Sequence, residues 1–174
     1  MLILGIETSC DETAAAVVED GRRILSNTIS SQIPLHEKFG GVVPEIACRA
    51  HSECLIPVIE TAVEEAGIAL ADLDGVAVTA GPGLIGALLV GVATAKTLGW
   101  ALEVPVVAVD HLEAHIYANH LSHEVEYPYL TLLVSGGHTA VYLSESVVSH
   151  RLMGRTIDDA AGECVDKVAK LFGH

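Results

Sequence analysis

The chain has 174 residues, 51% of them hydrophobic and only 4% aromatic, and its formal net charge is −14. This length and apolar content suit one domain, or one lobe with the start of another, with a core of aliphatic side chains. The charge argues against a large phosphate-binding surface on this chain alone, although a local basic patch or a basic partner could supply contacts to nucleic acid.

Neither a membrane span nor a signal peptide is expected. No uninterrupted apolar run reaches the roughly 18 residues of a span, and no basic segment precedes the first apolar run. The four cysteines have no CxxC spacing, which favours reduced thiols in a cytoplasmic protein over a disulfide framework. They are Cys10, Cys48, Cys54 and Cys164.

The N-terminal region predicts three strands, at 2–6, at 13–18 and then through about residue 31. The loop 7–13 between the first two is rich in hydroxyls and carboxylates. Its hydroxyl and backbone N–H groups could hold phosphate, and its carboxylates could hold a metal or orient water. The alternative is a plain Asx or Ser/Thr turn. The candidate residues are Ser9, Asp11 and Glu12.

The segment 30–43 is irregular, with Pro34 and two consecutive glycines, and predicts a loop. A helix is then expected from Pro44 to about Ala66, because proline is favoured in the first helical turn and a glycine follows. Pro57 should kink or divide that helix.

A buried strand is expected at 74–79, followed by the glycine-rich turn 80–86 and a helix at 87–102. Such a turn lets phosphate approach the N–H groups of a helix, but it is neither a Walker A motif nor GxGxxG. The helix is almost wholly small and apolar, which predicts a place in a core or an interface.

The run 104–109 predicts another buried strand, and the helix that follows has Asp110 placed to cap it. His111 and His115 lie one helical turn apart, so both imidazoles could reach one metal ion; the alternative is two solvated histidines. Glu113 is about 200° around the helix from His111, which disfavours a zincin-type metalloprotease.

A second pair of apolar strands joined by a polar loop follows, with strands at 129–134 and 140–143 around the glycine-rich loop 135–139. Two such loops on related lobes would make a phosphate clamp if they faced each other. A last helix should run to about Leu171, capped by Thr156 or Asp158.

Six segments together resemble the catalytic subunit of the tRNA N6-adenosine threonylcarbamoyltransferase (threonylcarbamoyladenosine synthase) family, formerly called O-sialoglycoprotein endopeptidase. The resemblance covers nearly the whole chain in order. The segments are 4–13 (LGIETSCDET), 40–45 (GGVVPE), 79–84 (TAGPGL), 110–115 (DHLEAH), 133–139 (LVSGGHT) and 157–163 (IDDAAGE).

The resemblance implies an α/β protein of the actin/Hsp70/sugar-kinase type, built on RNase H-like sheets. The first lobe would span 1–109, a connecting helix with the histidine pair 110–127, and the truncated start of a second lobe 128–174. The implied reaction is transfer of the threonylcarbamoyl group from threonylcarbamoyl-AMP to N6 of adenosine 37 in ANN-decoding tRNAs.

The resemblance also implies a set of ligands and partners. His111 and His115 would bind one divalent metal ion per subunit, with Fe(II) favoured over Zn. A nucleotide or substrate site would include Leu133, Val134, Ser135, Gly136, Gly137 and Asp166. The partners would be tRNA, threonylcarbamoyl-AMP or an ATP/AMP-type nucleotide, a paralogous subunit and an accessory ATPase, without a membrane. No catalytic residue is assigned.

Members of the family are roughly twice as long, and their third metal ligand, an aspartate, lies in the half that has no counterpart here. We therefore expect residues 1–174 alone to be inactive. Two alternatives from other classes are a noncatalytic paralogous scaffold or dimerisation subunit and a small-molecule kinase or ATPase of the same fold.

Overall fold

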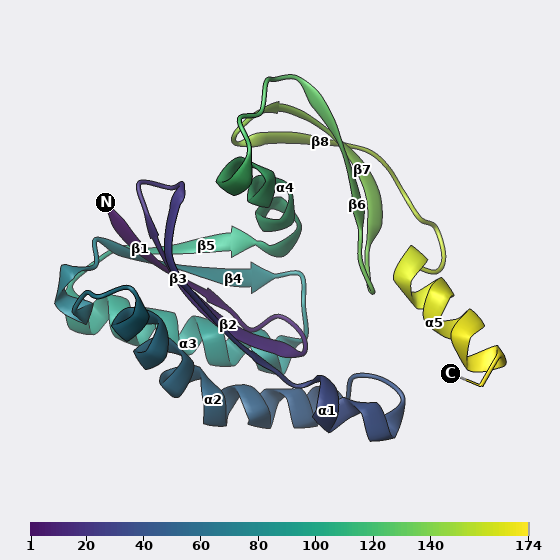
Figure 1. The fold of residues 1–174 in the computed structure, drawn as a ribbon, viewed down its shortest axis with the longest axis horizontal. Helices are drawn as coiled ribbons and strands as arrows, with labels where there is room; N and C mark the ends of the chain where they lie inside the picture. The colour runs from purple at the N-terminus through teal and green to yellow at the C-terminus, as the bar shows by residue number, and fades with distance from the viewer. Residues whose placement is uncertain (174) are drawn as a thin grey trace. The chain divides into compact units, whose positions relative to one another are not determined.

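The computed structural model describes residues 1–173, which form two compact units. The first comprises Met1–His111, and the second begins at Leu112. Figure 1 shows the elements of both units along the chain.

The first unit is built on a mixed five-stranded sheet of order β3-β2-β1-β4-β5. Strands β1, β2 and β3 form consecutive antiparallel hairpins, whereas β4 and β5 run parallel to β1. The carboxyl ends of β1, β4 and β5 consequently lie at one edge, the usual place for ligands in open α/β sheets. The strands are β1 (Leu2–Glu7), β2 (Glu12–Glu19), β3 (Arg23–Ser31), β4 (Gly75–Gly81) and β5 (Val106–Asp110).

Two long helices, α2 (Pro44–Glu65) and α3 (Ile85–Leu102), pack side by side on this sheet (Figure 1). Alternate residues of the strands point toward the helices and form a core between the helices and the sheet. This core is aliphatic, as the composition predicted. Its fully buried side chains include Leu4, Val17, Leu55, Ala62, Val76 and Ala95.

Helix α2 is continuous from Pro44 to Glu65, so Pro57 does not divide it. Pro57 lies on the exposed side of the helix, while Leu55, Val58 and Ile59 around it are buried in the core. Burial of this face outweighs the roughly 3 kcal/mol that an interior proline costs a helix.

The segment after β3 is more regular than the sequence pattern indicated. It contains a short helix, α1 (Ile33–His36), and a single 3₁₀ turn, η1 (Glu37–Phe39), which ends at Gly40 with φ of 69°. Another 3₁₀ turn, η2 (Leu70–Asp72), precedes β4. Buried polar side chains, described below, fix α1 against the sheet.

Helix α3 is long and apolar enough to cross a membrane by length and composition alone, although Lys96 interrupts its apolar run. Its buried face consists of Ala87, Gly91, Ala95 and Gly99, one residue per turn. These small residues let the helix backbone approach the sheet closely, as in a domain core.

The second unit contains an antiparallel sheet of order β6-β7-β8. The sequence pattern missed β8 entirely. Helix α4 begins at His111, the last residue of the first unit. The side chain of Ile116 on this helix is fully buried. The elements are α4 (His111–Ser122), β6 (Tyr129–Val134), β7 (Thr139–Ser146), β8 (Ser149–Arg155) and α5 (Ala161–Leu171).

The start of α5 differs from the predicted cap. Its N-cap is Ala160, which makes no side-chain capping hydrogen bond. Instead, the backbone N–H of Ala161 donates to Thr139 Oγ1 on β7 at 2.8 Å. Thr156 donates its hydroxyl to the Asp159 carbonyl oxygen at 2.7 Å, so it stabilises the preceding turn rather than the helix.

Candidate functional site

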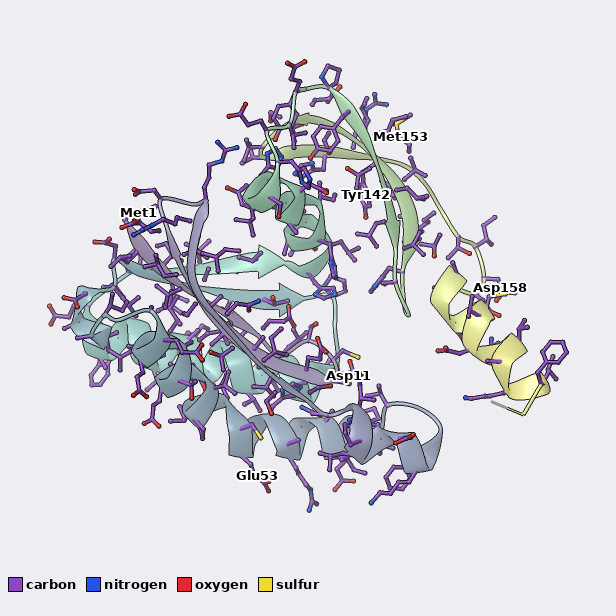
Figure 2. The ribbon with its side chains drawn as sticks, in the orientation of Figure 1. Met1, Asp11, Glu53, Tyr142, Met153 and Asp158 are labelled. Carbon is purple, nitrogen blue, oxygen red and sulfur yellow. The ribbon has the colours of Figure 1, made fainter. Side chains whose placement is uncertain are left out.

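The first polar loop connects β1 to β2 as predicted, and its backbone is held by the glycine-rich turn after β4. The Ser9 carbonyl accepts a hydrogen bond from the Leu84 N–H at 2.8 Å. Ser9 itself is buried, Asp11 is half-buried and Glu12 is exposed. Figure 2 labels Asp11 in this loop.

A buried histidine, which the sequence reasoning did not select, supports the same loop. His51 on α2 is fully buried, and its Nε2 lies 3.0 Å from the Cys10 carbonyl oxygen. Its Nδ1 lies 2.8 Å from Thr13 Oγ1 and 3.3 Å from Gln32 Nε2. Nε2–H therefore donates to Cys10 and Nδ1 accepts, which is the neutral tautomer. Burial lowers the pKa of His51, consistent with this arrangement.

The most specific contact joins Glu7, at the end of β1, to His111, at the start of α4. Glu7 Oε2 lies 3.2 Å from His111 Nδ1, and Ser9 Oγ lies 3.3 Å from the same nitrogen. Thr79 on β4 donates its hydroxyl to Glu7 Oε2 at 2.6 Å, and the Ser9 N–H donates to Oε1. The structure thus brings Ser9 to His111 and adds Glu7, which sequence reasoning did not single out.

Charge and hydrogen bonding perturb both titratable groups of this contact. Burial raises the pKa of Glu7, but hydrogen bonds with His111, Ser9 and Thr79 outweigh it and bring the pKa down to about 2. The hydrogen bond with Glu7 raises the pKa of His111, against an opposing effect of burial. Glu7 is therefore an anionic acceptor at neutral pH.

His111 and His115 are the first and fifth residues of α4, so they share one helix face. Imidazole nitrogens suit Fe, Zn, Ni or Cu, and a carboxylate bonded to the second nitrogen is the usual support of a metal-binding histidine. The donor set therefore fits a divalent transition metal. Within residues 1–173, no group of three or more histidine, cysteine, aspartate or glutamate side chains is arranged to hold a metal ion.

The second polar loop forms a tight turn between β6 and β7. The Ser135 N–H donates to the His138 carbonyl oxygen at 2.8 Å, and the His138 N–H donates to Ser135 Oγ at 3.0 Å. Gly136 and Gly137 are exposed, and a β-carbon on either would meet no other atom within 4 Å. The backbone of this turn is therefore open to close approach by a ligand.

The flanking predicted residues lie in different settings. Leu133 is buried, whereas Val134 beside it is 54% exposed. Asp166 is exposed on α5, next to Lys167, whose Nζ bonds Asp159 at 2.7 Å and lies 3.0 Å from Glu163.

A pocket of about 450 Å³ in the second unit adjoins the glycine turn. Its walls include Leu112, Gly137, Tyr142, Arg155 and Asp158. Tyr142 and Asp158 are labelled in Figure 2. Polar and apolar side chains both line this pocket.

Comparison with known families decides where this chain belongs. Residues 23–174 match the family model described as tRNA N6-adenosine threonylcarbamoyltransferase. The chain belongs to this family. The enzyme of that name from Geotalea uraniireducens is 59% identical over 173 residues, and that from Trichlorobacter lovleyi is 56% identical.

The alignment with these relatives covers 99% of the chain but only 50% and 51% of the two relatives. The chain thus spans about half the length of the curated relatives it matches. The part matched is the N-terminal half, as expected from the motifs.

Solved structures support the predicted fold class. YeaZ from Pseudomonas aeruginosa superposes with a TM-score of 0.60 at 21% identity, covering 88% of this chain and 64% of that one. The activator of 2-hydroxyisocaproyl-CoA dehydratase from Clostridium difficile, solved with bound ADPNP, gives 0.57 at 16% identity, covering 100% and 53%. The actin/Hsp70/sugar-kinase fold class is confirmed.

Proposed function

We propose that this chain forms the N-terminal part of an enzyme that transfers the threonylcarbamoyl group from threonylcarbamoyl-AMP to N6 of adenosine 37 in ANN-decoding tRNAs. In this reaction the N6–carbon bond forms as N6 loses a proton to solvent, the bond from the carbamoyl carbon to the phosphate oxygen breaks, and AMP leaves. Membership of the transferase family, with 59% identity across 173 residues, carries the proposal.

His111 and His115 would hold one divalent metal ion, with Fe(II) favoured over Zn. When bound, the ion would act as a Lewis acid toward the carbamoyl carbonyl. The support in this chain is the helical spacing of the two imidazoles and the carboxylate at His111 Nδ1. An additional ligand would come from the part of the enzyme that has no counterpart here.

The turn between β6 and β7 would bind the adenylate, with Leu133 to Gly137 around the nucleotide and Asp166 as a further contact. The open space beside Gly136 and Gly137 favours this, because a glycine-rich turn without side chains lets a phosphate approach its backbone N–H groups. The neighbouring pocket would take part of the same ligand. Ser9, Asp11 and Glu12 in the first loop remain candidates for phosphate or metal contacts.

The enzyme would act with partners in the cytoplasm. With a net charge of −14, this chain would hold tRNA through a local basic patch or with the help of a basic partner. A paralogous subunit would dock on the outer faces of α2 and α3, where Ile56, Ile85, Leu89 and Trp100 are 50% to 84% exposed. An accessory ATPase would complete the assembly. Residues 1–174 alone would be inactive.

The test compares His111→Ala and His115→Ala in the full-length protein with His123→Ala, an exposed histidine just beyond α4. We expect the first two variants to lose bound metal and transfer of radiolabelled threonine to tRNA, while His123→Ala keeps both. Unchanged metal content and transfer in the first two would refute the metal site.

ATP turnover without tRNA modification would instead identify a kinase or ATPase, and stable binding to a paralogue without metal or transfer would identify a scaffold. Measurable transfer by purified residues 1–174 would contradict the expected inactivity.

A further inference from the structure

We propose that Glu7 is a positioning residue for His111: its carboxylate holds the imidazole with Nδ1 turned toward β1, so that Nε2 is the nitrogen offered to a metal. This inference rests on the metal site proposed above. The observation behind it is the 3.2 Å contact between Glu7 Oε2 and His111 Nδ1.

The sheet topology explains why two residues 104 positions apart meet. Strand β4 pairs in parallel with β1 on one side and with β5 on the other. Glu7 ends β1, and His111 directly follows the end of β5. Both residues therefore lie at the same edge of the sheet, with Thr79 of β4 between their strands.

The Glu7 carboxylate is itself fixed. Thr79 Oγ1 donates to Oε2 at 2.6 Å, and the Ser9 N–H donates to Oε1, so both oxygens are hydrogen-bonded. The carboxylate cannot rotate without breaking one of these bonds. A carboxylate that is held at both oxygens can fix the orientation of the imidazole ring that it contacts.

The contact also selects a tautomer. An ionised carboxylate only accepts hydrogen bonds, so a neutral His111 must carry its proton on Nδ1 and its lone pair on Nε2. Ser9 Oγ, at 3.3 Å from Nδ1, lies on the same side of the ring. Residues that orient metal-binding histidines in this way typically contribute 10- to 100-fold to metal affinity.

A merely structural role is the competing explanation, because Glu7 also accepts bonds from the loop that it begins. The two explanations differ in what they predict for His111. A structural role predicts lower stability with unchanged tautomer and metal affinity. A positioning role predicts that both properties of His111 change.

The experiment uses the full-length protein, metal-free and labelled with ¹⁵N-histidine. Long-range ¹H–¹⁵N correlation spectra report the His111 tautomer, assigned through the signal lost in His111→Ala. Zn²⁺ and Fe²⁺ affinities are measured by competition with a chromophoric chelator. The variants are Glu7→Gln, Glu7→Asp and Thr79→Val, with Glu19→Gln on the neighbouring strand as the matched acidic control.

We expect the wild type to hold the Nδ1–H tautomer, and Glu7→Gln to lose it and to bind metal about 10- to 100-fold more weakly. Glu7→Asp should keep part of the Nδ1–H tautomer and of the metal affinity. Thr79→Val should lose less of both than Glu7→Gln does. Glu19→Gln should match the wild type in tautomer and affinity. The two milder variants also provide the test if Glu7→Gln does not fold.

Wild-type tautomer and affinity in Glu7→Gln and Thr79→Val would overturn the inference, even if both variants were less stable. A wild-type protein whose metal binding does not depend on His111 and His115 would overturn the proposed metal site. The tautomer measurement would still decide whether Glu7 orients His111.

Discussion

Gly83 lies directly against Ser9: a β-carbon at residue 83 would be 2.6 Å from the Ser9 carbonyl oxygen and 2.7 Å from its Cβ. The glycine-rich turn after β4 therefore supports the first polar loop, and the adjacent Leu84 N–H bonds the same carbonyl. The absence of a side chain at residue 83 allows this approach.

Gly83→Ala should push the first loop away from the turn. We expect a loss of about 1–3 kcal/mol in the free energy of unfolding, as for other overpacked sites, measured by urea denaturation. Gly41→Ala is the control, because a β-carbon there would meet nothing within 4 Å. Equal stability of the two variants would show that the loop yields without cost.

Gly162→Ala should disturb the second polar loop in the same way. A β-carbon at residue 162 would be 2.7 Å from the Ser135 carbonyl oxygen and 2.8 Å from the Gly136 Cα, both backbone atoms. We expect weaker AMP binding by the full-length protein, measured by calorimetry. Gly154→Ala on β8, where a β-carbon has open space, should bind AMP normally. Normal binding by Gly162→Ala would separate this loop from the nucleotide site.

His51 should make stability depend on pH below neutrality. Its folded-state pKa lies below 6.5, so the unfolded chain binds the extra proton first as the pH falls. The stability that neutral His51 contributes is complete above pH 6.5 and declines as pH falls toward the folded-state pKa. Nearby Glu7 and Asp11 favour the charged form, whereas His36 opposes it.

The measurement for His51 compares unfolding of the wild type and His51→Gln at about pH 7.5 and 5.5. The wild type should be more stable than His51→Gln at pH 7.5. The difference in free energy of unfolding between the two proteins should be smaller at pH 5.5. Subtraction of the variant removes the contributions of other titrating groups, including His111. A gap of constant size would exclude the buried histidine as the source.

Residues 1–174 alone should self-associate through β6. This edge strand exposes Leu130 and Leu132 at 67% each and Val134 at 54%, on one face of the sheet. Unpaired, apolar edge strands promote association between chains. Sedimentation should reveal concentration-dependent oligomers that Leu130→Lys with Leu132→Lys reduces. Val148→Lys, in the turn before β8, should leave them unchanged; an equal effect of all these lysines would indicate nonspecific charge repulsion.

Much of the local structure follows from nearest neighbours in the sequence. Apolar runs bounded by turn residues predicted β1 and β6, and the helical spacing of His111 and His115 placed both on one face of α4. Strand β8 is an exception to this local prediction. Strand β8, with the sequence SHRLMGR, has little apolar alternation, and it forms because β7 supplies its hydrogen-bonding partner.

The contacts that shape the candidate site depend on the tertiary structure. Glu7 and His111 are separated by 104 positions, and His51 and Cys10 by 41. No local pattern distinguishes such a carboxylate or histidine from any other. The sequence by itself therefore determined the elements and the residue types that chemistry needs. Only the tertiary structure decided which of them meet. Parallel pairing of β1, β4 and β5 brings Glu7 and His111 to one edge of the sheet, and packing of α2 on the sheet brings His51 to Cys10.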